Sequence, residues 1–525
     1  MGEYTLRVTY DEETRVHTTP GEKNLLEELR ALGYSGISAP CGGNGTCKRC
    51  TIIVSGKAVK IGETEPESLS DAEIPSCRYT AAGNLEIIIP KFEKMEIMTN
   101  GAGNIAGGGD GLGIAVDIGT TTVAAFLYDL ATGERLAVES GRNAQRAYGA
   151  DVISRIQFCA EEGGLDRLTG VVRAQLDAAI DALCARTGRA RADITVVSIA
   201  GNTVMQHIFQ GLSPVKIGVS PFTPESLFGE IYAASEFFTG LHNNAILYQT
   251  PALAGYVGGD ITAGLYSSGA WLETGDCLFI DIGTNGEMGL GNSGGFVTCA
   301  TAAGPAFEGA EIECGMDGSV GAISVAAFEN GGITFEVIGG GEPTGICGSG
   351  LIDALAALLK SGVVLESGRM VSPEDAPEGM RDAVRRMEDG KLRYYFTDKV
   401  YISAEDVRQL QLAKAAIRAG IETLMEQRGK VYDDVASVMI AGGFGAFMNV
   451  RSAGIIGLLP PKLLDKTSHV GNTAGAGAAL ALREAARGAL SGLTDRCDYL
   501  ELSSSALFMD KYIECMLFDE VEDVV

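Results

Sequence analysis

The sequence has no apolar stretch long enough to span a membrane, and its first residues, MGEYTLRVTY, do not resemble a signal peptide. Basic residues are scarce: 41 Lys and Arg stand against 68 Asp and Glu, which gives a net charge of −27. This balance disfavours nucleic acid or an anionic membrane as a partner. The motif Gly-x4-Gly-Lys-Ser/Thr is also missing, which excludes a P-loop NTPase. We therefore expect a cytoplasmic protein that binds neither nucleic acid nor membrane.

Glycine and apolar residues are plentiful instead. Of the 525 residues, 71 are glycine and 46% are apolar, which allows large cores and many tight turns. A chain of this length exceeds one ordinary domain. Residues 92–111 read FEKMEIMTNGAGNIAGGGDG, and the Gly, Ala and Asn of their second half predict a flexible linker. This linker would separate a first domain, residues 1–91, from a second, residues 112–525.

The first domain combines strands, one helix and a cysteine-rich loop. YTLRVTY alternates as a strand, TRVHTT can pair back on it as a hairpin, and KNLLEELRALG has helical spacing. Two further strands, CTIIVSG and NLEIIIP, are expected after the loop. This order of elements resembles the β-grasp arrangement of plant-type ferredoxins.

Four of the twelve cysteines stand apart by their spacing. They are Cys41, Cys47, Cys50 and Cys77. Four thiolates suit either tetrahedral zinc or an iron–sulfur cluster. Zinc sites usually use two short Cys-x2-Cys pairs, and Cys77 has no such mate, whereas the loop glycines let backbone N–H groups close around a negatively charged cluster. The pattern favours a [2Fe–2S] cluster, and its spacing resembles that of plant-type and vertebrate-type [2Fe–2S] ferredoxins.

The second domain contains an internal repeat. LGIAVDIGTTTVAAFLYDLATGE begins at residue 112 and CLFIDIGTNGEMGLGNSGGF at residue 277, and both are an apolar strand ending in Asp-Ile-Gly-Thr followed by a turn and a second strand. Duplication explains this match best, with a first lobe over residues 112–270 and a second over residues 271–525. A helix over residues 403–429, capped by Ser403 with Asp406, leads into a strand that ends in AGGFGAF. The pattern is α/β, with binding loops at strand ends.

These loops have the composition of a nucleoside triphosphate site, which needs backbone N–H groups around the phosphates and carboxylates near Mg²⁺. One candidate phosphate hairpin is Gly119, Thr120, Thr121 and Thr122, and the other is Gly283, Thr284, Asn285 and Gly286. Asp117 and Asp281 would hold Mg²⁺ through water. Gly442, Gly443 and Phe444 would leave room for the nucleoside.

The order of these elements resembles the superfamily of acetate and sugar kinases, heat-shock ATPases and actin, which has a two-lobed, actin-like (ribonuclease H-like) fold. The resemblance covers most of residues 112–482. It implies that AGYVGGDITAG (254–264) and VGNTAGAGAALAL (470–482) are the two connections between the lobes. Asp260 in the first connection would then position the attacking water, although a helix cap near Thr262 is an equally good interpretation.

A [2Fe–2S] domain fused to this ATPase fold resembles the ATP-dependent reductive activators of corrinoid proteins. SIAGNTVMQHIFQG, GPAFEGAEIECGMDGSVGAI and GICGSGLIDALAALLKSG also match that family. The resemblance implies transfer of one electron from the cluster to Co(II), which regenerates Co(I) in a corrinoid methyltransferase protein, and it implies an upstream electron donor. Family members are commonly dimers, although the sequence shows no interface. Larger members insert a small domain after the ferredoxin, which this chain lacks.

Three other functions fit parts of the sequence. An activator of 2-hydroxyacyl-CoA dehydratases shares the ATPase fold but has no ferredoxin domain. A metabolite kinase with a fused redox domain would need a substrate pocket that nothing in the sequence identifies. A simple electron carrier would leave the ATP site unexplained. The chain itself has four histidines and no Asp-x-His-x-x-Gly motif for binding a corrinoid.

Overall fold

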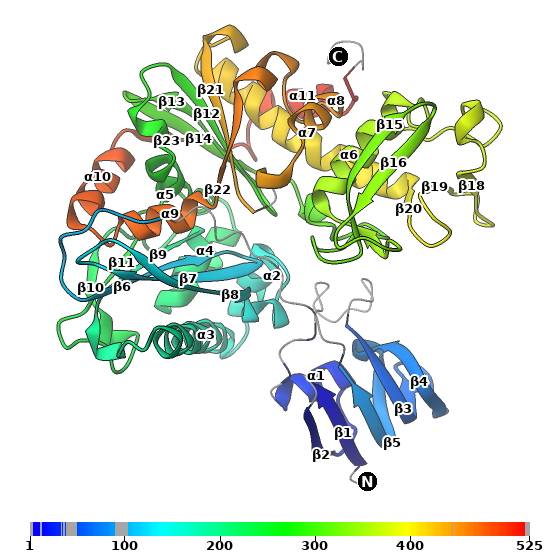
Figure 1. The fold of residues 1–525 in the computed structure, drawn as a ribbon, viewed down its shortest axis with the longest axis horizontal. Helices are drawn as coiled ribbons and strands as arrows, with labels where there is room; N and C mark the ends of the chain where they lie inside the picture. Colours follow the sequence, from blue (N-terminus) through cyan, green and yellow to red (C-terminus); the bar gives the residue numbers. More distant parts are fainter. Residues whose placement is uncertain are drawn as a thin grey trace.

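The structure is a computed structural model that describes residues 4–10, 13–32, 34, 37, 50–89, 103–443 and 445–519. A small N-terminal unit lies beside two larger lobes (Figure 1). None of the helices in these ranges has the length and apolar character that a membrane span requires.

The N-terminal unit is a mixed sheet with one helix. Its elements are β1 (Tyr4–Tyr10), β2 (Glu13–Thr19), α1 (Leu25–Ala31), β3 (Thr51–Lys60), β4 (Glu67–Pro75) and β5 (Tyr79–Ile88). The strand order is β2-β1-β5-β3-β4, in which β1 and β5 are parallel and the other pairs antiparallel. Leu25, Leu26 and Leu29 of α1 are buried in the core that the helix shares with the sheet. Apolar residues at helical spacing therefore attach α1 to the sheet.

The predicted hairpin and helix are confirmed, but the strands after the cysteine loop are three, not two. The expectation missed β4, and β5 begins at Tyr79, earlier than expected. The sequence of β4, ESLSDAEIP, buries only Ile74, so it lacks the apolar alternation that marks a half-buried strand. The strand β4 forms because it pairs with β3 along most of its length.

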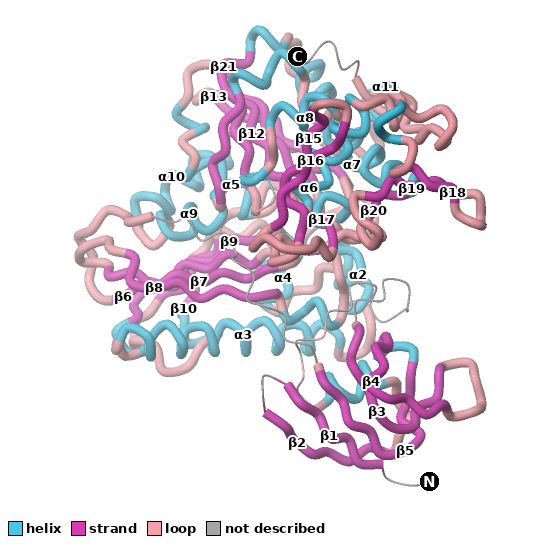
Figure 2. Tube along the Cα trace, turned by 45° about the vertical axis from the view of Figure 1, so that its right-hand side comes forward, coloured by secondary structure: helices cyan, strands magenta, loops and turns pink. Residues whose placement is uncertain are grey.

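The first lobe is a six-stranded sheet between helices. Its elements are β6 (Leu112–Ile118), β7 (Thr122–Asp129), β8 (Arg135–Arg142), α2 (Val152–Cys159), α3 (Gly164–Thr187), β9 (Ile194–Gly201), α4 (Thr203–Gln210), β10 (Ile231–Ala233), β11 (Ile246–Gln249) and α5 (Gly259–Ser267). The strand order is β10-β11-β9-β6-β7-β8. The helix α3 lies along one face of this sheet, where its buried residues join the lobe's main core (Figure 2).

The second lobe repeats this plan. Its elements are β12 (Asp276–Ile282), β13 (Gly286–Asn292), β14 (Gly295–Thr301), α7 (Ala404–Gln427), β21 (Val435–Ala441), α8 (Val450–Ile455), β22 (Thr467–Gly471), α9 (Thr473–Leu480), α10 (Glu484–Thr494), β23 (Cys497–Tyr499) and α11 (Ala506–Glu514). The strand order is β22-β21-β12-β13-β14-β23. The helix α7 has the predicted capping box between Ser403 and Asp406.

The two sheets share five strands in the same order and direction. In β11-β9-β6-β7-β8 and in β22-β21-β12-β13-β14, the first three strands are parallel and the next two pairings antiparallel. Asp117 lies near the end of β6 and Asp281 near the end of β12, at equivalent places in the two sheets. The predicted α/β fold with an internal duplication is confirmed.

A side unit that the sequence did not indicate extends from the second lobe. It comprises β15 (Ala322–Glu329), β16 (Gly332–Val337), β17 (Gly345–Ile346), α6 (Gly348–Lys360), β18 (Val384–Arg386), β19 (Leu392–Tyr395) and β20 (Tyr401–Ser403). The strands form two three-stranded sheets, β16-β15-β17 and β18-β19-β20. In Figure 1 this unit lies at the far end of the second lobe from α9 and α10.

The predicted linker is not a free coil over residues 103–111, the part that the structure describes. Ile105 N donates to Gly133 O at 2.8 Å, Gly108 N to Ala131 O at 2.9 Å, and Gly109 N to Leu130 O at 2.9 Å. This segment therefore runs against the end of the β7–β8 hairpin of the first lobe. Composition alone predicted flexibility because it does not reveal a neighbouring backbone that can pair with glycine-rich chain.

Candidate functional site

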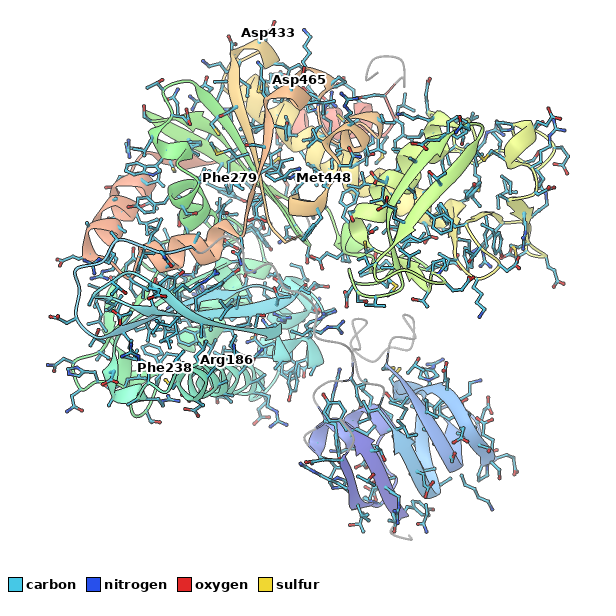
Figure 3. The ribbon with its side chains drawn as sticks, in the orientation of Figure 1. Arg186, Phe238, Phe279, Asp433, Met448 and Asp465 are labelled. Carbon is cyan, nitrogen blue, oxygen red and sulfur yellow. The ribbon has the colours of Figure 1, made fainter. Side chains whose placement is uncertain are left out.

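The two predicted connections between the lobes form a pair of packed helices, α5 and α9. A Cβ on Gly477 of α9 would lie 2.4 Å from Ala263 O of α5, and a Cβ on Gly264 would lie 2.7 Å from the ring of Phe279. Ser267 Oγ of α5 also donates to Thr473 O of α9 at 2.7 Å. Glycines thus let the two helices meet backbone to backbone. Figure 3 labels Phe279, which projects from the second-lobe sheet toward this pair.

The first candidate phosphate hairpin, residues 119–122, joins β6 to β7. Asn143 Nδ2 donates to Gly119 O at 2.8 Å, and Asn202 Nδ2 donates to Thr120 Oγ1 at 2.9 Å. Arg155 Nη2 donates to Thr120 O at 2.5 Å. Three side chains from separate elements of the first lobe therefore fix the shape of this turn.

Arg155 is a fully buried cation behind this hairpin. Its Nε also donates to Gly149 O at 3.0 Å. Burial lowers the pKa of Arg155 to about 9, so the guanidinium stays charged at neutral pH. A positive charge at this place favours an anion at the hairpin because the surrounding protein screens it less than water does. The sequence analysis did not single out this residue.

The second candidate hairpin, residues 283–286, joins β12 to β13. Gly283 N donates to Asn285 O at 2.9 Å, which makes a tight turn. A Cβ on Gly283 would have no heavy atom nearer than 3.9 Å, so this face of the turn is open. Thr284 Oγ1 donates to Glu308 Oε1 at 2.8 Å. The backbone of the turn is thus accessible to a ligand.

The three predicted carboxylates lie in one electrostatic neighbourhood. Burial raises the pKa of Asp117 to about 6, and burial together with the Asp117 charge raises that of Asp281 to about 7. The pKa of Asp260, in the first turn of α5, is raised to about 8 by burial and by the charges of Asp281 and Asp117. Asn472 Nδ2 at the start of α9 donates to Asp117 Oδ2 at 2.9 Å, which favours the ionised form. The lobes and their connections thus meet at this acidic group.

Two acidic residues that the sequence analysis missed belong to the same region. Glu287 pairs with Asp281 across the β12–β13 hairpin, and its pKa is raised by burial and by the charges of Asp260 and Asp281. Glu308 lies between the two hairpins, as Thr121 Oγ1 donates to its Oε2 at 3.2 Å. Within the described ranges no group of three or more His, Cys, Asp or Glu side chains is placed to hold a metal ion directly. Carboxylates that contact Mg²⁺ through its water shell do not need that arrangement.

The predicted nucleoside loop lies directly behind Asp281. Gly442 has φ +91°, and a Cβ there would be 2.6 Å from Asp281 Oδ1, so the position requires glycine. A Cβ on Gly443 would have no heavy atom within 4 Å. Phe444 lies outside the described residues.

Two of the four predicted cluster ligands are described, and they lie together. Cys50 precedes β3 and Cys77 follows β4, at the end of the sheet where Thr51 pairs with Pro75. Both cysteines are buried, and Ser76 N donates to Cys50 O at 2.9 Å. The buried Ser76 Oγ has no hydrogen-bond partner within the described part of the chain. Cys41 and Cys47 lie outside it.

Comparisons with known proteins agree on one family. The model described as the C-terminal domain of RACo, the ASKHA domain, matches residues 276–524, and the model of the RACo middle region matches residues 112–271. The corrinoid activation enzyme RamQ of Eubacterium limosum is 33% identical over 419 residues, which are 78% of this chain and 70% of the relative. The chain belongs to the RACo family of reductive activators.

A second curated relative and a solved structure extend the RACo match. The Co(II) methylated amine-specific corrinoid protein reductase of Methanosarcina barkeri is 25% identical over 397 residues, 69% of this chain and 68% of the relative. A solved structure titled as a reductive activator for a corrinoid, iron-sulfur protein covers 98% of both chains at 29% identity, with a TM-score of 0.69.

Membership of the RACo family helps to decide between the functions that the sequence left open. Neither the dehydratase activator nor the metabolite kinase is favoured, because both curated relatives are named for action on corrinoid proteins. The segment predicted as the first ATPase lobe is matched by the RACo middle region, and the second by the ASKHA domain. The equivalent strand orders show that the two segments have related folds.

Proposed function

We propose that this protein is an ATP-dependent reductive activator that passes one electron to the Co(II) of a corrinoid protein and so regenerates Co(I). The observation that carries this proposal is the meeting of two equivalent hairpins and three carboxylates between the lobes of a RACo-family chain. A corrinoid protein is the expected partner, since both curated relatives are named for corrinoid activation or reduction.

We assign residues 1–91 to a ferredoxin-like β-grasp domain and Cys41, Cys47, Cys50 and Cys77 to its [2Fe–2S] cluster. The strand order, the packed helix α1 and the two adjacent buried cysteines support this assignment. The partnerless Ser76 hydroxyl also fits, because an O–H group beside a thiolate ligand can donate to sulfur. When bound, such a cluster supplies a one-electron donor with a potential near about −400 mV.

We place ATP between the hairpins of residues 119–122 and 283–286, with Asp117 and Asp281 contacting hydrated Mg²⁺. Besides burial, the charge of Asp117 raises the pKa of Asp281, and the charges of Asp281 and Asp117 raise the pKa of Asp260. A divalent cation opposes this effect by favouring the ionised carboxylates. Asp260 would then be ionised and could accept a proton from the attacking water. Gly442, Gly443 and Phe444 would border the nucleoside, with the lobes divided at residues 270 and 271.

ATP is required because transfer from the cluster to Co(II) is expected to run uphill. Each 59 mV of unfavourable potential lowers the equilibrium constant about tenfold for one electron. A contact between the N-terminal unit and the first lobe offers a route for coupling. Arg30 Nη1 of α1 donates to Ala147 O at 2.5 Å, and Ala147 ends the short 3-10 helix (Ala144–Ala147) that follows Asn143, which holds Gly119. A movement of the hairpin of residues 119–122 can therefore be transmitted through this contact to the N-terminal unit.

The test is anaerobic and optical. Reduced protein is mixed with a Co(II) corrinoid methyltransferase subunit, and the Co(I) absorption band is followed with and without ATP. Co(I) should form much faster with ATP. Consumption of ATP without Co(I) formation, across several corrinoid proteins, would contradict the proposal. Cys50→Ala should abolish the visible absorption of the cluster while ATP binding survives, which separates the two sites.

A further inference from the structure

The sequence GPAFEGAEIECGMDGSVGAI contains a segment, residues 304–321, for which the proposed function has no role. It links β14 to the side unit. A Cβ on Gly315 would lie 2.1 Å from Gly309 O, and a Cβ on Gly309, which has φ +71°, would lie 2.9 Å from Met316 N. The two halves of the segment therefore pack backbone against backbone. Glu308 lies at the end of a short 3-10 helix in the first half (Pro305–Glu308), and Asp317 lies in the second half.

This segment reaches the first lobe at two neighbouring points. Thr121 Oγ1 donates to Glu308 Oε2 at 3.2 Å, and Arg142 Nη2 pairs with Asp317 Oδ2. Thr121 precedes Thr122, and Thr122 pairs with Arg142 in the β7–β8 register. Both contacts therefore attach the second lobe to the first phosphate hairpin and to the strand beside it.

Glu308 contacts the other hairpin as well, through the 2.8 Å hydrogen bond from Thr284 Oγ1. One carboxylate thus accepts a hydroxyl hydrogen from each of the two hairpins. These two donors oppose the effect of burial, which raises the pKa of Glu308, and so favour its ionised form. A threonine hydroxyl has a single hydrogen, so a hydroxyl that donates to Glu308 cannot donate to a phosphate oxygen at the same time.

We propose that Glu308 is a positioning residue of the nucleotide site, which ties the two hairpins together and competes with nucleotide phosphates for the hydroxyls of Thr121 and Thr284. This inference rests on the proposed function, since it assumes that the hairpins bind phosphates. A phosphate chain long enough to reach both hairpins competes for both hydroxyls, whereas a shorter one competes for one or none. Glu308 should therefore oppose ATP more than ADP, and ADP more than AMP.

The test measures the dissociation constants of Mg–ATP, Mg–ADP and AMP for the purified full-length protein and its variants. Glu308→Ala frees both hydroxyls, so it should bind ATP about tenfold more tightly, a ratio that corresponds to about one net hydrogen bond. ADP should gain less and AMP should be unchanged. The two hydroxyls donate to different oxygens of Glu308. Glu308→Gln replaces one of these oxygens by an NH2 group, which cannot accept, so this variant should fall between wild type and Glu308→Ala. A merely structural role would shift all three ligands together.

Two control variants sharpen this test. Asp317→Asn weakens the other contact with the first lobe but leaves the hydroxyls bound to Glu308, so it should not change the ratio of ATP to ADP affinity. Glu342→Ala removes one charge from an exposed position in the same lobe and should leave all three ligands unaffected. The same ATP-selective gain in Asp317→Asn would assign the effect to the interlobe contact in general and overturn the proposal.

Two results distinguish this inference from the proposed function. Unchanged or weaker ATP binding by Glu308→Ala, with thermal unfolding equal to wild type, would overturn the role of Glu308 alone. If wild type failed to bind Mg–ATP at all, both the inference and the proposed function would be wrong.

Discussion

The two copies of the duplicated fold keep the same strands but surround their hairpins differently. In the first copy, Asn143, Asn202 and the buried Arg155 hold the hairpin from behind. In the second copy, a backbone hydrogen bond from Gly283 N to Asn285 O closes the turn of the hairpin, and Glu287 and Glu308 lie beside it. A buried cation thus lies behind the first hairpin, whereas no such cation has been described behind the second.

The strand register shows where this difference arises. Asp117 pairs with Ala124 in the first copy, whereas Asp281 pairs with Glu287 in the second. Duplication therefore supplies the geometry of the two hairpins, and differences in the residues around them give the two copies different functions. We infer that the first copy mainly binds phosphate and that the second, together with Asp260, mainly handles the cation and the attacking water.

The largest expected effect is the loss of ATP hydrolysis when each of the two equivalent aspartates is replaced by asparagine on its own. Asp281→Asn should lower the rate of ATP hydrolysis by about a hundredfold or more, because the second copy is inferred to handle the cation and the attacking water. Asp117→Asn should cost about tenfold. The measurement is phosphate release at saturating ATP, with the visible absorption of the cluster as a check on the N-terminal unit. Equal losses would contradict the proposed division of work.

Removal of the buried Arg155 cation should lower the stability of the first lobe and its affinity for ATP. Arg155→Met leaves Thr120 O and Gly149 O without their donor, so the free energy of unfolding should fall by about 2 kcal/mol. The dissociation constant of ATP should also rise, because the positive charge behind the hairpin is lost. Denaturant unfolding and ligand titration measure the two effects. Arg189→Met, at a half-exposed arginine of the same lobe, should change stability by no more than about 0.5 kcal/mol.

The contact between the copies can be tested at its glycines. Gly477→Ala places a Cβ 2.4 Å from Ala263 O, so it should lower the free energy of unfolding by about 1–3 kcal/mol. Gly488→Ala in α10 meets no heavy atom within 4 Å and should raise it by about 0.5 kcal/mol. Thermal unfolding of both variants is the measurement. A Gly477→Ala variant as stable as wild type would show that α5 and α9 can separate without cost.

A dependence of stability on pH is also expected at Asp260, in the helix α5 that connects the first lobe to the second. The pKa of Asp260 is raised to about 8 in the folded protein, against about 4 when unfolded. Between these values the folded state binds a proton that the unfolded state has released, so this group's contribution to stability falls as pH rises through that window. Asp260→Asn should therefore match wild type near pH 4 and exceed it in unfolding temperature near pH 8 when EDTA is present. Mg–ATP should reduce the difference, since the cation favours the ionised carboxylate.

The sequence predicted what short motifs encode. The two Asp-Ile-Gly-Thr strands and the helix α7 with its capping box depend on neighbours in the chain, and both have the expected form. The duplication was visible for the same reason, because each copy carries its own local pattern.

The residues that the sequence did not reveal act over long separations. Thr121 and Glu308 are 187 positions apart, and Arg155 meets Thr120 across 35. Glu287 was detectable in principle, since aligning the two copies at Asp-Ile-Gly-Thr sets it against Val123. The strand β4 escaped because pairing with β3 decides its conformation and its own side chains are mostly exposed.

The backbone contact of α5 with α9 is also a point about which the two lobes can rotate. Asp260 lies in the first turn of α5, and Asn472, which donates to Asp117, precedes α9. The carboxylates therefore lie next to the point where the two lobes are joined. A rotation about this point displaces nearby atoms little and distant ones most. The side unit with β18 to β20 lies far from it in Figure 1. The spacing of the carboxylates can thus stay nearly constant while the outer rim of the second lobe sweeps through the largest arc.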